Sequence, residues 1–454
     1  MSTPNHRPAR SWISSDRAVP RLLVRPLREF LDTEVAGGVV LLAAALIALF
    51  WANSPLGDTY ESLWSTRVTI GVGDWAQVED LRHWVNDGLM AVFFFVVGLE
   101  VKREIVKGEL STAKAAAMPV IAAAGGMVVP AALYLVLTPA GVAGHGWGIP
   151  MATDIAFALG VLALCGPRIP SSLRVFLLSL AIVDDVGAIV VIALVYTPEL
   201  DVAFVAVAVA GLLAVVVLRA ARVWWVPIYV VIGTATWFAT LRSGVHATIA
   251  GVILGLLTPV RTFDPNAMQD LSIEEDGDRR PSAGDERSER RRARASVSVG
   301  ERIAHDLHPW TSFVVVPLFA LANAGVELGA DSLRAAFSSP VTRGVLVGLV
   351  VGKTIGITSF AWGAERLGVA ARPAGVGWVQ MTGAAAVAGI GFTVSIFIAG
   401  LAFEDGALVE EAKVGILAAS VLATAIGATL LRMSHSSKQL DPVEDPDEST
   451  GSAR

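Results

Sequence analysis

Two adjacent carboxylates, Asp184 and Asp185, interrupt the apolar run Leu177–Ala193, which reads LLSLAIVDDVGAIVVIA. Charge inside a bilayer costs a few kcal/mol or more, so ionisable residues there usually face a bundle interior or a wet cavity, where they bind ions or relay protons. A structural ion pair is the plainer alternative. Because two aspartates stand side by side, we favour an ion or proton site.

Other polar groups also lie in apolar segments. Asp154 follows Thr153 in PMATDIAF, Lys353 lies within GLVVGKT, and the stretch 383–393 holds three glycines and Thr393. Hard cations prefer oxygen ligands, and carboxylates, hydroxyls and the carbonyls freed at broken helices supply them. The predicted ligand set is Thr153, Asp154, Asp184 and Asp185.

The spacing of the two aspartates also constrains their roles. Consecutive helical residues point about 100° apart, so Asp184 and Asp185 cannot both face one ligand squarely. We expect one to meet the cation and the other to meet Lys353. Burial and neighbouring like charge raise the pKa of a carboxyl group toward neutrality, so one group can hold either a proton or a cation. A site with this competition exchanges the two ions when it opens alternately to either side, and no enzyme chemistry or cofactor is required.

Composition places the chain in a membrane. Of its 454 residues 54% are hydrophobic and only 17% are charged, and the mean hydropathy is +0.61. A soluble protein of this length would have about a quarter of its residues charged. The formal net charge of −6 carries no information about nucleic acid, and none is predicted as a partner. The lipid bilayer is the expected surrounding.

Twelve apolar segments approach the ~20 residues that a transmembrane helix requires. They lie at about 35–53, 84–101, 116–137, 147–165, 173–196, 202–218, 224–240, 244–258, 309–326, 343–363, 378–403 and 411–431. Basic residues favour alternate loops nearly throughout. The positive-inside rule therefore places both termini in the cytoplasm and supports an even number of helices.

The charged and polar segments divide the chain into five parts. Asp264–Gly300 is dense in charge and nearly lacks large apolar residues, which predicts disorder. The parts are a cytoplasmic basic arm (1–33), helices 1–8 (34–260), a disordered charged cytoplasmic linker (261–300), helices 9–12 (301–433) and a disordered cytoplasmic tail (434–454). Between helices 1 and 2, Arg67–Asp74 has the β-branched alternation and glycines of a small extracellular hairpin.

Several long motifs carry a family resemblance. The stretches VGLEVKRE, ATDIAFALGVLAL, LAIVDDVGAI, SGVHATIAGVILG, LHPWTSF, PLFALANAGV and GIGFTVSIFIAGLAF occur in this order. Together they resemble the NhaA-type sodium/proton antiporters, from about Glu34 to Leu431 apart from the insert. The resemblance implies exchange of Na+ or Li+ for H+ across the bacterial inner membrane, in pH and sodium homeostasis. It also implies an all-α polytopic membrane fold of twelve helices, with inverted three-helix repeats (helices 3–5 and 10–12) and broken helices 4 and 11 crossing at the midplane.

The resemblance also assigns roles to residues. Asp184 and Asp185 correspond to the ion and proton carriers, Asp154 and Thr153 complete the site, and Lys353 pairs with Asp184. Asp154 would balance the positive half-helix ends and Lys353 the negative ones. A homodimer joined through the hairpin at 67–74 is expected as well.

Family pH sensing maps to a second set of residues. These are Glu100, Arg103 and Glu104 at the end of helix 2, His246 in GVHAT, and the start of helix 9. There the chain departs from the family, because Ala304 stands where a glutamate is expected and Glu301 lies one turn away. For His246, packing as a neutral imidazole is an equal alternative to a sensing role.

Competing functions fit the residues less well. Gly352-Lys353-Thr354 resembles the end of a phosphate-binding loop, but the first glycine of that motif would fall at Val347. His305 and His308 have no third ligand nearby for zinc. An intramembrane aspartyl protease would carry Gly-x-Gly-Asp in a helix, whereas here it occurs only at Gly71–Asp74 in a polar loop. A channel gives no reason for titratable, ion-competing carboxylates.

Overall fold

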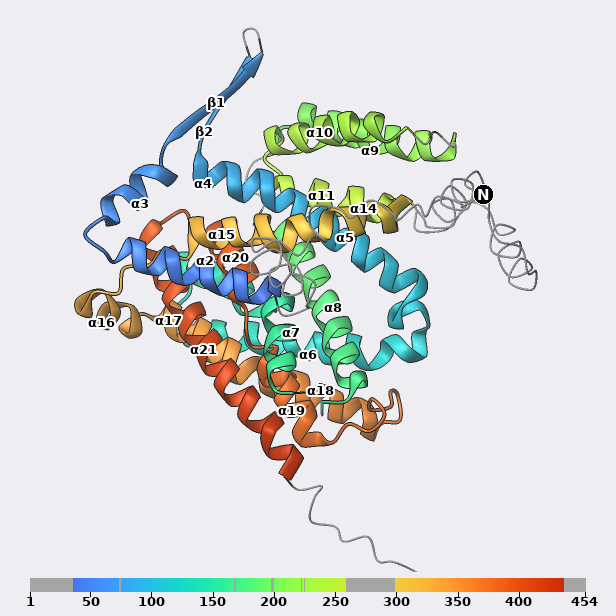
Figure 1. Ribbon diagram of the computed structural model, residues 1–454, viewed down its shortest axis with the longest axis vertical. Coiled ribbons are helices and arrows are strands. Elements are labelled where there is room, and N and C mark those ends of the chain that lie inside the picture. The colour runs from blue at the N-terminus through green and yellow to red at the C-terminus, as the bar shows by residue number, and fades with distance from the viewer. Residues whose placement is uncertain are drawn as a thin grey trace, which may run out of the picture.

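The computed structural model describes residues 36–436 except for 73–74, 167–168, 197–199, 222, 224 and 259–298. This part of the chain is mostly helical and contains one two-stranded sheet (Figure 1). Its many apolar helices confirm the predicted class of a helical, polytopic membrane protein.

Five helices of the described chain are long and apolar enough to cross a bilayer. They are α6 (Ala113–Leu137), α8 (Ser171–Val195), α9 (Val202–Ala220), the continuous run Pro340–Arg366, and Gly406–Ser434 within α21 (Gly406–Ser436). The run Pro340–Arg366 consists of α17 (Pro340–Val347), the π-helical turn η7 (Gly348–Gly352) and α18 (Lys353–Arg366). Of the five, α8 is the most buried, with 61% of its apolar window inside the protein against 11% for α9. The helix that carries Asp184 and Asp185 is therefore central.

Three further pairs of helices are bent at a short break. They are α2 (Ala36–Ala52) with α3 (Gly57–Trp64) at 116°, η5 (Val142–Met151) with α7 (Ile155–Leu164) at 45°, and α19 (Trp378–Val387) with α20 (Phe392–Ala402) at 47°. The second and third pairs are the segments that the sequence predicts to be broken.

The remaining helices are shorter or irregular. They are α4 (Leu81–His83), η3 (Trp84–Leu89), α5 (Met90–Lys107), η4 (Glu109–Ser111), α10 (Val226–Arg242), α11 (Ala247–Leu257), α14 (Val299–Trp310), η6 (Thr311–Val315), α15 (Val316–Asn323) and α16 (Ala330–Ser338). In Figure 1, α9 and α10 lie side by side at one edge of the molecule.

Each predicted span overlaps helical residues, but several boundaries differ. The span predicted at 309–326 begins ten residues earlier, at Val299, and the one predicted at 244–258 contains only the 11 residues of α11. Among the described residues, five helices are long and apolar enough to count as membrane spans. The number rises to at most eight if each bent pair is counted as one span. The number twelve and the repeats therefore stay predictions.

The predicted linker and terminal segments lie mostly outside the described residues. Residues 1–33 and 261–298 belong to this group, as does the tail after Ser436. However, residues 299–300 and 434–436 are helical, because α14 begins at Val299 and α21 ends at Ser436. These helix ends extend a few residues past the predicted boundaries at 300 and 434, and the division into domains stays a prediction.

The hairpin is longer than predicted. Strand β1 (Arg67–Val72) pairs antiparallel with β2 (Trp75–Asp80), from Arg67 opposite Asp80 to Val72 opposite Trp75. The stretch 67–74 thus supplies only the first strand and the connection, and the second strand follows it. In Figure 1 the hairpin extends away from the helices.

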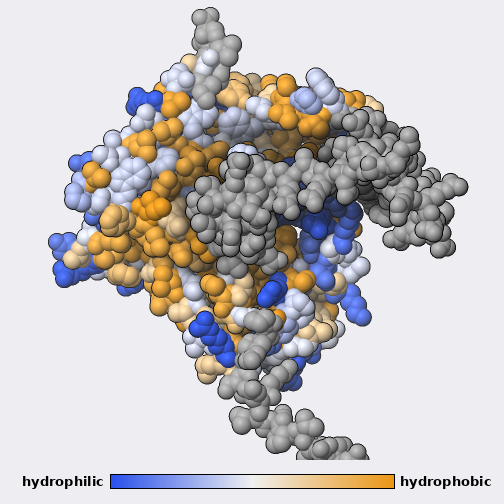
Figure 2. Space-filling model, in the orientation of Figure 1, coloured by the Kyte–Doolittle hydropathy of each residue, from blue (hydrophilic) through white to orange (hydrophobic). Residues whose placement is uncertain are grey.

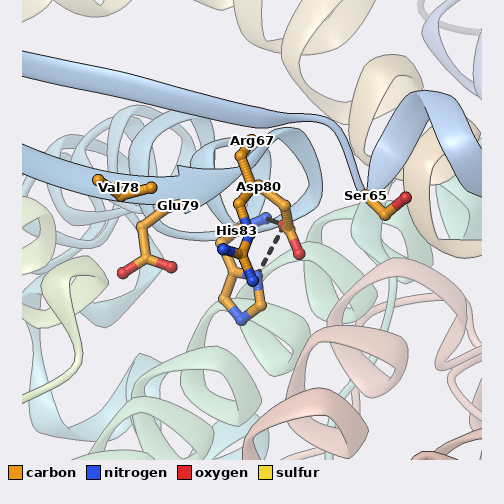
Figure 3. Close-up of a pocket in the computed structure, with 6 residues that line it drawn as sticks. All are labelled: Ser65, Arg67, Val78, Glu79, Asp80 and His83. Carbon is orange, nitrogen blue, oxygen red and sulfur yellow. Dashed lines mark hydrogen bonds and ion pairs between the residues drawn. The ribbon is translucent and has the colours of Figure 1, made fainter.

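At the base of the hairpin Asp80 joins β2 to α4. Its Oδ1 accepts hydrogen bonds from the His83 backbone N–H (2.8 Å) and, at 2.7 Å, from the His83 ring. Burial opposes ionisation of Asp80, but the hydrogen bonds from His83 hold the pKa of this carboxyl group below its ordinary value. A shallow pocket lies here (Figure 3), lined by Ser65, Arg67, Val78, Glu79, Asp80 and His83.

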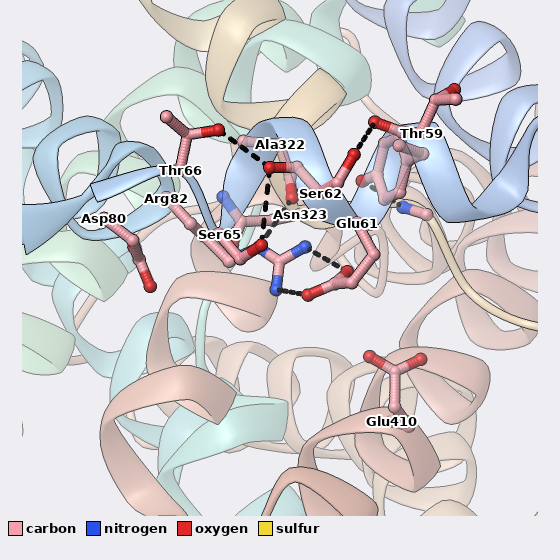
Figure 4. Close-up of polar contacts among 12 residues, drawn as sticks. Thr59, Glu61, Ser62, Ser65, Thr66, Asp80, Arg82, Ala322, Asn323 and Glu410 are labelled. Atoms are coloured by element: carbon pink, nitrogen blue, oxygen red, sulfur yellow. Dashed lines mark hydrogen bonds and ion pairs between the residues drawn. The ribbon is translucent and has the colours of Figure 1, made fainter. Parts of the chain in front are cut away.

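Arg82 ties the hairpin region to the helices. Its guanidinium donates two hydrogen bonds to the Glu61 carboxylate of α3, at 3.0 and 2.8 Å (Figure 4). The Nε–H donates to the Ala322 carbonyl in the last turn of α15 at 3.2 Å. A cation at the C-terminus of a helix is favourable because the free carbonyls carry partial negative charge. One side chain therefore joins α3, α4 and α15.

Apolar side chains fill the interior and also cover much of the outside. Phe397 of α20 contacts Phe94 of α5 and Phe319 of α15, with ring centroids 5.4 and 6.2 Å apart. On the outside, large apolar residues such as Val217 (63% exposed) and Val231 (68%) remain uncovered on α9 and α10. Apolar colour dominates much of the face in Figure 2. An apolar exterior of this extent suits a lipid surrounding.

We expect Arg82→Ala to lower the free energy of unfolding by about 1–2 kcal/mol, because it removes a bidentate, partly buried ion pair and a helix-end contact. Thermal unfolding of the detergent-solubilised protein measures the change. The control is Arg334→Ala, which removes an ion pair whose arginine is 80% exposed and should change stability by less than about 0.5 kcal/mol. Equal effects of the two substitutions would contradict the role of Arg82.

Candidate functional site

The break between η5 and α7 places Asp154 at the start of a half-helix. Its Oδ1 accepts the Phe157 backbone N–H at 3.0 Å, which is the N-cap arrangement that aspartate favours. Its Oδ2 accepts two hydrogen bonds from Thr393 of α20, from the hydroxyl at 2.6 Å and the backbone N–H at 3.2 Å. One carboxylate therefore meets the N-terminal ends of two half-helices, where the partial charge is positive.

The break between α19 and α20 faces the first one. The Ile390 carbonyl accepts the Asp154 backbone N–H at 2.7 Å. In the other direction, the Ser395 hydroxyl of α20 donates to the Ile149 carbonyl of η5 at 2.8 Å. A Cβ atom at Gly389 would meet the Leu349 carbonyl oxygen of η7, so this glycine lets the break between α19 and α20 lie close against η7. Each break thus satisfies backbone groups that the other leaves free.

Lys353, at the start of α18, lies fully buried between the breaks and α8. Its ammonium group donates to Asp184 Oδ2 and, at 3.0 Å, to Thr153 Oγ1. The Thr153 hydroxyl lies 2.9 Å from both Asp184 Oδ2 and the Ala388 carbonyl oxygen. With a single hydrogen it donates to one of these while it accepts from Lys353. The predicted pairing of Lys353 with Asp184 is therefore present as a contact.

Asp185 differs from its neighbour. It is only 1% exposed, and its buried Oδ1 atom has no hydrogen-bond partner among the described residues. The Oδ1 atoms of Asp184 and Asp185 are both buried acceptors without a hydrogen-bond partner among the described residues. Their different surroundings follow from the 100° between consecutive helical positions. Unpaired buried carboxylate oxygens are unfavourable unless a proton or a cation neutralises them.

The electrostatics of the site are dominated by negative charge. Asp184, Asp154 and Glu100 all add to the negative field at Asp185, and Lys353 opposes it. Among the described residues, no group of three His, Cys, Asp or Glu side chains is placed to hold a metal ion. A cation at Asp184 and Asp185 would therefore draw further ligands from hydroxyls, carbonyls or water.

The residues predicted to sense pH lie on three elements, namely α5, the start of α11 and α14. On α5, Glu104 accepts from Ser179 of α8 at 3.2 Å and from the Glu109 backbone N–H at 2.8 Å, whereas Arg103 is exposed. Glu100 is partly buried and adds to the negative field at Asp185. The structure thus ties one of the three to the helix that carries the aspartates.

Glu301 and His246 contact other elements. Glu301 of α14 forms an ion pair with Lys107 of α5, with 2.8 Å between Oε1 and Nζ. The Nε2 atom of His246, at the start of α11, lies 2.7 Å from the Tyr196 carbonyl oxygen. Ala304 lies within α14 and is partly buried. These contacts join α5 to α14 and the start of α11 to the end of α8.

The sequence does not predict the hydrogen bond between Thr393 and Asp154. In the sequence, Thr393 stands out only as a polar residue in a glycine-rich run. A usable signal exists, because a threonine two residues after Gly391 falls in the first turn of a half-helix, where its hydroxyl lies beside free N–H groups. The Ser395 and Ala388 contacts join segments about as far apart in the chain, 246 and 235 residues, and the sequence gives no local signal for either.

The match with known proteins decides the family. The family model described as Na+/H+ antiporter 1 matches residues 28–431. The chain belongs to this family. Among its relatives, Na(+)/H(+) antiporter NhaA 3 of Frankia alni is 46% identical over 412 residues, which cover 90% of this chain and 88% of that one. NhaA of Oleidesulfovibrio alaskensis is 46% identical over 426 residues (90% and 94%), and NhaA 2 of Sorangium cellulosum is 44% identical over 461 residues (98% of each).

The membership confirms the family resemblance seen in the sequence. The protein is a transmembrane antiporter of the Na+/H+ exchange class, with Na+ and H+ as the transported ions. This family comprises transporters rather than enzymes.

Removal of the Thr393 hydroxyl tests the contact between the breaks. We expect Thr393→Val to lower the free energy of unfolding of the antiporter by about 1–3 kcal/mol, because Asp154 loses a buried hydrogen-bond donor. The control is Thr382→Val in α19, where the hydroxyl only donates to the Trp378 carbonyl one turn earlier. Chemical unfolding in detergent compares the two, and equal stabilities would speak against the Thr393 contact.

Proposed function

We propose that the antiporter exchanges Na+ or Li+ for H+ through direct competition of the cation and protons for Asp184 and Asp185. The observation that carries this proposal is the pair of buried Oδ1 atoms without partners on adjacent aspartates. In a low-dielectric interior such acceptors bind either protons or a hard cation, and both choices reduce the same unfavourable charge.

The neighbouring groups have distinct parts in this proposal. The Oδ1 atom of Asp185 has no hydrogen-bond partner among the described residues, and Asp185 is the principal carrier. Asp184 is shared between Lys353 and the transported ion, with Thr153 beside it. Asp154 stays bound to Thr393 and Phe157 and neutralises the helix ends. In this proposal the carboxylates of Asp184 and Asp185 bind the transported ions, whereas the carboxylate of Asp154 stabilises the helix ends.

Alternating access completes the transport cycle. We infer that the crossing half-helices, joined by a few hydrogen bonds rather than by continuous backbone, tilt together and expose the aspartates to one side at a time. The proposal includes twelve spans with inverted repeats, both termini in the cytoplasm of a bacterial inner membrane, and a part in pH and sodium homeostasis. The alternation of basic loops supports the orientation.

Two finer parts of the proposal concern assembly and regulation. A homodimer would form through the hairpin, since β1 and β2 leave their outer edges free to pair among the described residues. The pH response would involve Glu100, Arg103, Glu104, His246 and Glu301. In support, Glu104 contacts α8, and the Lys107–Glu301 ion pair joins α5 to α14.

We predict that Asp185→Asn abolishes Na+-driven proton flux at every pH, because an amide cannot alternate between a proton and a cation. Proteoliposomes with an internal pH indicator measure the flux after pulses of Na+ or Li+, with protein-free liposomes as the baseline. Asp331→Asn, at a fully exposed position, is the control and should transport normally. Exchange at ordinary rates in Asp185→Asn would refute the site.

Lys353→Ala should behave differently. Without the ammonium group the carboxylates hold their protons more tightly, so the residual activity should move to more alkaline pH. The same flux assay over a series of pH values measures the displacement. Lys114→Ala, which removes an exposed lysine at the start of α6, should leave the profile in place. A profile displaced toward acid would contradict the pairing role of Lys353.

A further inference from the structure

The helix that carries Lys353 packs on α6 without side chains between the backbones. A Cβ atom at Gly352 would lie 2.7 Å from Pro130 Cα of α6, and one at Gly348 would lie 2.7 Å from Pro150 Cβ of the neighbouring η5. One turn further on, a Cβ at Gly356 would meet the Gly125 carbonyl oxygen. Distances this short leave no room for any residue larger than glycine, and helices in membranes approach closely through such positions.

The side chain of Lys353 projects from its helix at this contact. It directly follows Gly352, the last residue of the π-helical turn η7. A π-helical turn holds more residues than an α-helical one, so η7 sets the direction in which the next side chain points. On the facing helix, a Cβ at Gly126 would lie 3.7 Å from Lys353 Cδ and 2.8 Å from Ile357 Cγ1. Gly126 therefore lets Ile357 of α18 lie close against α6, one turn beyond the lysine, and the lysine stem passes this glycine at ordinary contact distance.

The reach of Lys353 is fixed by this packing. The side chain is fully buried and ends in contact with Asp184 on α8 and Thr153 at the η5–α7 break. If α18 were held further from α6, the ammonium group would withdraw from at least one of these partners. Pro130 offers little accommodation, because the short distance from a Cβ at Gly352 is to its backbone.

We propose that Gly352 and Gly126 are positioning residues that set the depth at which the Lys353 ammonium group meets Asp184. Their effect on transport rests on the proposed function, because it acts through the charge balance of the aspartates. The contact itself is a separate matter of packing. The glycine-rich GLVVGKT stretch, which resembles a phosphate-binding motif, thereby receives a structural role.

The first test is the pH profile of Gly352→Ala in proteoliposomes. We expect a displacement toward alkaline pH, in the same direction as Lys353→Ala and on the order of half a pH unit, which is about threefold lower exchange at a fixed pH on the acid limb. Gly363→Ala is the matched control, since it lies in the same helix and an added Cβ meets nothing within 4 Å. If Gly352→Ala fails to fold, Gly126→Ala replaces it, because its added methyl group would lie 2.8 Å from Cγ1 of the buried Ile357 side chain and push α18 away from α6 without meeting backbone atoms.

The second test combines the substitutions. In the Lys353→Ala background, Gly352→Ala should add no further displacement, because a positioning residue acts only through the lysine. A structure of Gly352→Ala should show the ammonium group withdrawn from Asp184. An equal displacement in both backgrounds, or a variant structure that keeps this contact, would overturn the proposal. By contrast, a normal pH profile in Lys353→Ala would overturn the pairing role of Lys353 in the proposed function. In that case the structure of Gly352→Ala would still show whether Gly352 positions the ammonium group against Asp184.

Discussion

Unbalanced buried charge is the constraint on which the rest of this structure depends. Asp154, Asp184 and Asp185 are nearly or fully buried and have one buried ammonium partner, Lys353. If all were ionised, the group would carry an excess of negative charge that a low-dielectric interior does not tolerate. A cation or protons must supply the remainder. In the proposed mechanism the site is unstable without a cation or protons, so the release of one requires the binding of the other.

The fold holds this charge in place through irregular backbone. Two helix breaks face each other, and each provides carbonyl or N–H groups to the other through Asp154, Thr153, Thr393 and Ser395. Regular helices could not present these groups, because their backbone is satisfied internally. Glycines allow the breaks and the lysine-bearing helix to approach closely. In the proposed transport cycle these contacts are few enough to rearrange when the site changes the side to which it opens.

The sequence predicted the charged centre well because charge in an apolar run is rare and costly. Asp154, Asp184, Asp185 and Lys353 were predicted in this way, with Thr153 beside Asp154. The structure joins Thr153, Asp184 and Lys353 by hydrogen bonds, and the roles of all five in transport stay predictions. Other contacts were missed because they join segments that are distant in the chain. Arg82 with Ala322, Thr393 with Asp154 and Glu301 with Lys107 are examples. The second strand of the hairpin was missed because its alternation, in WAQVED, includes acidic and amide residues that also suit a loop.

The most direct test of the central claim is to count the protons that Na+ displaces from the purified antiporter. In weakly buffered detergent solution, an indicator dye records proton release as Na+ is added, and a parallel titration measures the bound Na+. The account predicts release of at least one proton for each Na+ bound near neutral pH, and none from Asp185→Asn. Binding of Na+ to the unaltered protein without proton release would contradict the competition at the two aspartates.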